Sequence, residues 1–96
     1  MMTENAKYTY IDTHAHVYDE AFAGEEDEIV KKSREAGVRL IIQPDIDLKE
    51  RGKMFDLYRR HPDFFRNMVG LYPGSVDEDW KKDVADAESH ARDAGV

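Results

Sequence analysis

The sequence predicts an α/β protein in which short strands alternate with longer helices. Three short apolar stretches are each followed by a helical pattern, and no Gly/Ser/Pro-rich linker interrupts this order. Strands joined in this way run parallel with right-handed crossovers. A complete (β/α)8 barrel uses about 31 residues per unit, so 96 residues correspond to about three units. We therefore expect residues 1–96 to form one domain, the N-terminal three β/α units of a truncated TIM-type (β/α)8 barrel.

Three segments are predicted to be strands. Residues 8–14 and 38–43 are rich in aromatic and β-branched side chains, and Pro44 ends the second segment. The third predicted strand spans 67–71 and is closed by the turn-forming sequence at 72–74.

The first two helices follow from their end signals. The first is expected over 25–36, with acidic residues in its first turn and Gly37 as the residue after its C-cap. The second is expected over 48–60, with Asp47 as N-cap. One stripe of the second helix carries Leu48, Arg51, Phe55 and Tyr58.

The third helix has the most regular pattern, and we expect its apolar stripe to face the core. The stripe consists of Trp80, Val84, Ala87, Ala91 and Ala94. Ser75 and Glu78 have the spacing of a capping box at its start. The sequence RDAGV at 92–96 repeats REAGV at 34–38, which leads into the second strand. A fourth strand is therefore expected to begin at Val96, at a unit boundary.

Composition excludes several classes of protein. The chain has no cysteine, so it has no disulfide partner and no cysteine-ligated metal. No apolar run approaches the roughly 20 residues that span a membrane, and no targeting signal is recognisable, so a cytoplasmic location is expected. The net charge of −7 opposes non-specific binding to nucleic acid, unless metal ions supply local positive charge.

The strongest chemical signal is the sequence DTHAH at 12–16, where the first strand ends. Alternation along a strand places Asp12, His14 and His16 on one face. Two imidazoles about 7 Å apart in Cα positions can bind one divalent cation, and Asp12 could orient an imidazole from behind. The alternative is a pair of ordinary polar residues leaving the core. The carboxyl end of a strand in an α/β pattern, where such folds bind ligands, favours the metal site.

Other polar residues are weaker candidates. Asp45 and Asp47 follow the second strand on the same rim, although turn formation and helix capping are the favoured roles. His61 is expected at the opposite end of the sheet, and His90 is expected to face solvent. Tyr72 either lines a substrate pocket on this rim or packs under the loop. The acids in the loop after the first strand, Asp19 and Glu20, are expected to be solvated.

Other hydrolytic and phosphate-binding chemistries lack their parts. No Gly-rich phosphate loop follows a strand, no cysteine can serve as nucleophile, and no serine lies in a nucleophile elbow. Metal-assisted hydrolysis is the chemistry that the motifs favour.

Four segments in order resemble the TatD family of metal-dependent hydrolases, within the amidohydrolase-like barrels. They are 11–16 (IDTHAH), 36–38 (AGV), 42–47 (IQPDID) and 70–76 (GLYPGSV). The resemblance implies a (β/α)8 barrel that hydrolyses phosphodiester bonds, chiefly in DNA, through metal-activated water. The implied cofactor is a divalent cation, with Mg²⁺ expected first and Mn²⁺ or Zn²⁺ as alternatives.

By the same resemblance, His14 and His16 match metal-binding positions. The family's remaining ligands and its water-activating aspartate would lie beyond Val96, so this chain alone is expected to be inactive. Tyr72 stands where the family usually has histidine. Two alternatives stay open: another H-x-H barrel hydrolase acting on an amide, lactone or phosphomonoester, or a non-catalytic module that oligomerises through open sheet edges.

Overall fold

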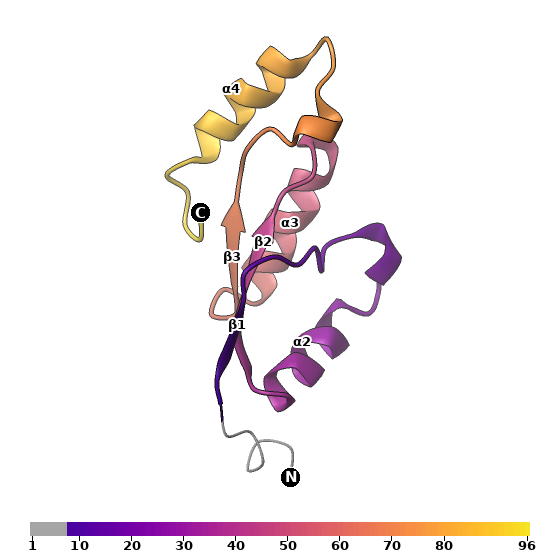
Figure 1. Ribbon diagram of the computed structural model, residues 1–96, viewed down its shortest axis with the longest axis vertical. Coiled ribbons are helices and arrows are strands. Elements are labelled where there is room, and N and C mark those ends of the chain that lie inside the picture. The colour runs from indigo at the N-terminus through magenta and orange to yellow at the C-terminus, as the bar shows by residue number, and fades with distance from the viewer. Residues whose placement is uncertain (1–7) are drawn as a thin grey trace.

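A three-stranded parallel sheet and three α-helices make up the computed structural model, which describes residues 8–96, the side chain of Ser75 excepted (Figure 1). The elements in chain order are β1 (Tyr10–Asp12), the 3-10 turn η1 (Glu20–Phe22), α2 (Glu26–Glu35), β2 (Val38–Pro44), α3 (Leu48–Arg60), β3 (Phe65–Met68), the 3-10 turn η2 (Pro73–Ser75) and α4 (Trp80–His90). The predicted alternation of strands and helices is confirmed. In the part of the chain that is described, no helix is both long and apolar enough to cross a membrane.

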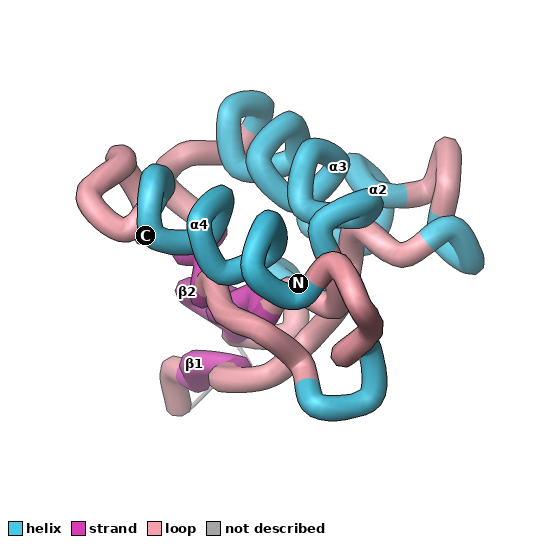
Figure 2. Tube along the Cα trace, turned by 90° about the horizontal axis from the view of Figure 1, so that it is seen from above, coloured by secondary structure: helices cyan, strands magenta, loops and turns pink. Residues whose placement is uncertain are grey.

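The sheet has the strand order β1-β2-β3, and one of its faces is packed against helices. In the register of β2 and β3, Ile41 pairs with Phe65 and Gln43 pairs with Asn67, and all four side chains are buried. Figure 2 shows α2 and α3 gathered on one side of the strands. The core between them contains Val17, Tyr18, Val30, Ile41, Met54, Phe55, Leu57, Phe64 and Phe65.

The opposite face of the sheet is open within residues 8–96. Ile11 of β1 and Met68 of β3 point to this face and are 53% and 52% exposed. A compact domain of this length has a radius of gyration of about 12.5 Å, whereas this one has 14.7 Å. A parallel sheet is normally covered on both faces, so this sheet is only half packed.

The first two helices form as their end signals predict. Gly37 follows the C-cap of α2 with a φ of 99°, a left-handed conformation that glycine adopts without steric cost. Asp47 caps α3, its Oδ1 accepting a hydrogen bond of 2.8 Å from the backbone N of Glu50. On α3, the predicted stripe is buried at Arg51 and Phe55, whereas Leu48 is exposed.

All three strands differ from their predicted bounds. The first is shorter because Asp12 Oδ1 accepts a hydrogen bond from the backbone N of His14, and this turn interrupts the strand pairing after Asp12. The second is one residue longer, because Pro44, which was expected to end it, still pairs with Met68 of β3. The third lies two residues earlier than predicted because Phe65, which is fully buried, pairs with Ile41. Beyond it, the backbone N of Gly70 donates to the side chain of Asp45 instead of extending the ladder.

The prediction for the third helix was wrong about which face is buried. Trp80 and Val84 are 44% and 39% exposed, and the buried residue of α4 is Asp83. The helix begins at Trp80 without a side-chain cap on Asp79, and the predicted capping box involves the side chain of Ser75, which lies outside the described part of the structure. Ion pairs to Arg51, described below, hold α4 in place of the apolar stripe.

Candidate metal centre

The chain leaves β1 in a tight turn that positions both candidate histidines. The carboxylate of Asp12 accepts a hydrogen bond of 3.0 Å from the backbone N of His14. Three residues after Asp12, the backbone N of Ala15 donates to the carbonyl of Ile42 at 3.3 Å, so the segment stays beside β2. The described hydrogen bond of Asp12 is thus to the backbone of a histidine.

The rings of His14 and His16 meet through their Nε2 atoms. These two nitrogens are 3.3 Å apart, and the ring planes are nearly perpendicular at 84°. A cation bound at about 2.1 Å from two nitrogens in a tetrahedral arrangement would separate them by about 3.4 Å. The observed separation therefore fits a single divalent cation shared by the two imidazoles.

The two rings open into a cavity of about 300 Å³ at the carboxyl ends of the strands. Its lining consists of His14, His16, Pro44, Asp45, Ile46 and Tyr72. Tyr72 is 54% exposed and borders the same space as the histidines. The geometry therefore brings four of the residues considered from the sequence to one cavity: His14, His16, Asp45 and Tyr72.

Tyr18 is a contact that sequence reasoning did not consider. Its ring is buried, and its hydroxyl donates a hydrogen bond of 2.6 Å to the carbonyl of Pro44. The same hydroxyl lies 3.1 Å from Nδ1 of His16. Burial first, and then the charge of Asp45, raises the pKa of Tyr18 above its ordinary value, so the phenol stays protonated. The signal for it was its spacing of two residues from His16.

Asp45 does not act as the turn former that its position suggested. It is buried, and its Oδ2 accepts from Arg51 Nε at 2.7 Å and from the backbone N of Gly70 at 3.3 Å. Burial raises the pKa of Asp45, and the hydrogen bond from Arg51 opposes that shift.

Arg51 binds three carboxylates that come from two parts of the chain. Besides Asp45, its guanidinium donates to Asp83 at 2.6 Å, to Asp86 at 2.7 Å and to the carbonyl of Gly70 at 3.1 Å. Burial alone would lower the pKa of Arg51, but the hydrogen bonds to the three aspartates outweigh it and raise the pKa. We call Arg51, Asp45, Asp83 and Asp86 the Arg51 cluster. It ties the ends of β2 and β3 to α4 and holds one wall of the cavity.

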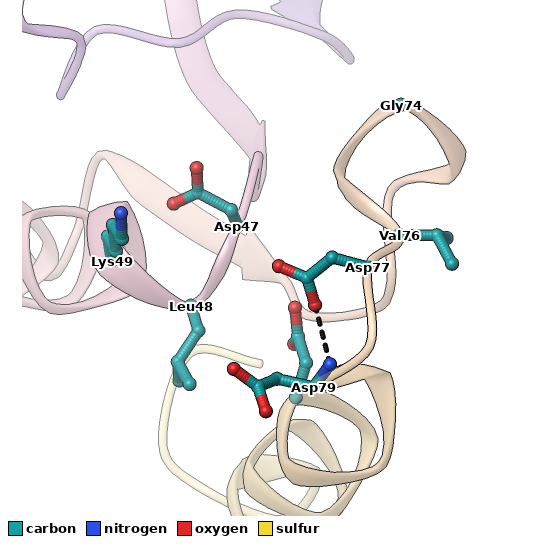
Figure 3. Close-up of a pocket in the computed structure, with 8 residues that line it drawn as sticks. Asp47, Leu48, Lys49, Gly74, Val76, Asp77 and Asp79 are labelled. Carbon is teal, nitrogen blue, oxygen red and sulfur yellow. Dashed lines mark hydrogen bonds between the residues drawn. The ribbon is translucent and has the colours of Figure 1, made fainter.

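A second, larger pocket of about 430 Å³ lies between the start of α3 and the segment that leads into α4 (Figure 3). Four aspartates line it, and three of them have structural partners. Asp47 caps α3, Asp83 pairs with Arg51, and Asp77 Oδ1 accepts from the backbone N of Asp79, the dashed contact in Figure 3. A helix cap, an ion pair and a turn therefore account for three of the four aspartates that line this pocket.

The other two histidines lie away from the cavity. His61 Nε2 is 2.8 Å from Asp27 Oδ1, at the end of α3 where β3 begins. His90 pairs with Asp93 at 2.6 Å and packs against the ring of Phe55, so it is partly covered where solvent exposure was expected. Among residues 8–96 no group of three or more His, Cys, Asp or Glu side chains is arranged to hold a metal, so His14 and His16 are an incomplete ligand set.

Comparison with known proteins supports the sequence resemblance. A search of curated proteins gives no match to this chain. The family model described as TatD related DNase, in contrast, matches residues 11–96, from the strand that precedes the histidines to the last residue. Because the match covers nearly the whole sequence, the chain belongs to the TatD-related DNase family.

Proposed function

We propose that the protein formed by this chain cleaves phosphodiester bonds of DNA with a divalent cation, and that His14 and His16 are two of the ligands. The family is one of metal-dependent hydrolases. The observation that carries the proposal is the 3.3 Å between the two Nε2 atoms, in a cavity at the carboxyl ends of parallel strands.

We propose a role at this site for each of four residues of this chain. When bound, a divalent cation polarises phosphoryl oxygens and lowers the pKa of water. His14 and His16 would bind it through Nε2, while Asp12 fixes the backbone of His14. Tyr72 borders the cavity and would contact the substrate.

Two imidazoles are fewer ligands than a catalytic metal takes, which is usually three or more protein groups. We therefore propose that the remaining ligands, and the base that activates water, come from outside residues 8–96. Mg²⁺ prefers oxygen ligands, so its use would require carboxylates among those groups. Mn²⁺ and Zn²⁺ accept imidazole more readily and are the other cations to test.

The sheet has the features expected of part of a (β/α)8 barrel, and we propose that fold for the domain. Its strands are parallel and in sequential order, and α2 and α3 cover one face. Beside β1, the backbone N of Tyr10 donates to Gly37 at 2.9 Å, where β2 begins. Beside β3, the backbone N of Asn67 donates to Gly95 at 2.6 Å. These two matching hydrogen bonds support our proposal that the repeated sequence leads into a further strand at Val96.

The acidic balance sets a condition on the substrate. With a net charge of −7, the protein would bind a polyanion through few, local contacts and through the cation. DNA cleavage should therefore fall as salt rises, because ions screen these contacts.

The test is a double variant, His14→Ala with His16→Ala, made in a protein that also contains the remaining ligands and assayed on DNA in Mg²⁺, Mn²⁺ and Zn²⁺. We expect turnover to fall by at least about 100-fold, because both nitrogen ligands are removed. His61→Ala is the matched control, since His61 pairs with Asp27 away from the cavity. Unchanged turnover in the double variant would exclude the metal assignment.

A further inference from the structure

We propose that Tyr18 is a positioning residue that selects the tautomer of His16, with the proton on Nδ1 and the lone pair on Nε2. This inference rests on the proposed role of His16 as a metal ligand. It concerns a different atom, the Nδ1 nitrogen on the side of the ring away from His14.

The direction of the hydrogen bonds follows from the donors available. A backbone carbonyl can only accept, so the contact of 2.6 Å to Pro44 uses the single hydroxyl hydrogen of Tyr18. The oxygen of Tyr18 must then accept in its other contact, from Nδ1 of His16 at 3.1 Å. A neutral imidazole has one N–H, so Nε2 of His16 carries the lone pair. That nitrogen is the one that faces His14.

The same contacts fix the orientation of the ring. Tyr18 is 3% exposed and belongs to the core, and Pro44 is the last residue of β2. His16 is therefore linked through one hydroxyl to the sheet, although it stands on a loop. His14 is exposed, and the described contact of its ring is with His16. His16 is accordingly the preorganised member of the pair.

Hydrogen bonding to the second ring nitrogen is the usual way in which proteins orient a ligating histidine. Loss of such a partner typically lowers metal affinity about 10- to 100-fold. The partner is most often a carboxylate, a carbonyl or water. Here the partner is the buried phenol of Tyr18, which is itself held by its hydrogen bond to the carbonyl of Pro44.

The test uses Tyr18→Phe, which keeps the buried ring and removes the hydroxyl. Two quantities are measured on the purified protein: the ¹⁵N chemical shifts of the His16 ring without metal, above the pH at which the ring is protonated, and the affinity for Zn²⁺ alone by calorimetry. We expect an Nδ1–H tautomer in the parent, its loss in the variant, and a 10- to 100-fold weaker affinity. Tyr58→Phe, on α3, is the matched control and should change neither quantity.

The outcomes separate this proposal from the proposed function. A tautomer or an affinity that is unchanged in Tyr18→Phe overturns the role of Tyr18, whatever the enzyme activity. If His16→Ala also binds Zn²⁺ as tightly as the parent, the ligand assignment itself fails. Thermal unfolding of each variant shows whether the fold is kept, and the tautomer is read only from protein that is folded.

Discussion

Two clusters of polar side chains stand at the same end of the sheet and are satisfied in opposite ways. In the Arg51 cluster, the guanidinium is buried and donates four hydrogen bonds. At the exit of β1, His14 is exposed, and the two imidazoles turn their Nε2 atoms toward each other beside an open cavity. In the first arrangement the polar atoms bind one another inside the fold, whereas in the second the two Nε2 atoms contact each other at the edge of a cavity.

We infer from this difference that the Arg51 cluster supports the fold around the cavity, whereas the two histidines would bind the ligand. Asp45 belongs to both regions, because it binds Arg51 and also lines the cavity of the histidines. Changes in the Arg51 cluster should therefore act on stability, and changes at the histidines should act on metal binding. The following predictions test that division, from the largest expected change in stability to the smallest.

Arg51→Met should cost about 3–5 kcal/mol in the free energy of unfolding, because it leaves the buried carboxylates of Asp45 and Asp83 without their cation. Urea unfolding at pH 7 measures this. Arg59→Met, an exposed arginine on the same helix, is the control and should change stability by less than about 0.5 kcal/mol. Equal effects of the two substitutions would mean that the cluster contributes nothing special to the fold.

The deficit of Arg51→Met should depend on pH. Burial already raises the pKa of Asp45 against the opposing effect of Arg51, so removal of Arg51 raises it further. A carboxyl group whose pKa is higher in the folded than in the unfolded protein contributes to stability below its unfolded pKa, about 4. That contribution is lost as the pH rises through the pKa of the folded state. The gap between parent and variant should be large at pH 7 and narrow toward pH 4. A gap that widens on acidification would contradict this.

Sequence reasoning succeeded where the signal is local and failed where it depends on distant contacts. The end signals of α2 and α3, at Gly37 and Asp47, are local, and both are confirmed. Strand alternation does not explain the approach of His14 and His16, because β1 ends at Asp12 and both histidines follow it in a turn. The link from Tyr18 to Pro44 spans 26 residues, and the link from Arg51 to Asp83 spans 32, so periodicity cannot show either.

For the third helix, too, a distant contact decided what the local sequence could not predict. Its apolar spacing correctly predicted a helix, but the ion pair with Arg51 determines which face is buried. An arginine in the apolar stripe of the second helix was the available clue. Nothing in the local sequence says which acids it would meet.

Asp45→Asn tests the residue that the two regions share. We expect a loss of about 1–2 kcal/mol in the free energy of unfolding, less than for Arg51→Met. The amide oxygen of Asn can still accept a hydrogen bond from Arg51 or from Gly70. The neutral amide also removes the cost of burying a charged carboxylate, the same cost that raises the pKa of Asp45. Chemical denaturation of both variants under one buffer condition gives the ranking. A larger loss for Asp45→Asn than for Arg51→Met would reverse it.

His14→Ala should have the smallest effect on stability and a large effect on metal binding. The side chain is exposed, and the described contact of its ring is with His16, so its removal should change the free energy of unfolding by less than about 0.5 kcal/mol. Unfolding in the presence of a chelator, compared with Zn²⁺ titration of the same protein, separates the two quantities. A loss above about 1.5 kcal/mol with metal absent would show that the imidazole supports the fold. A small loss together with weakened Zn²⁺ binding would show that its accessible nitrogen serves the ligand, which is the division that the two clusters imply.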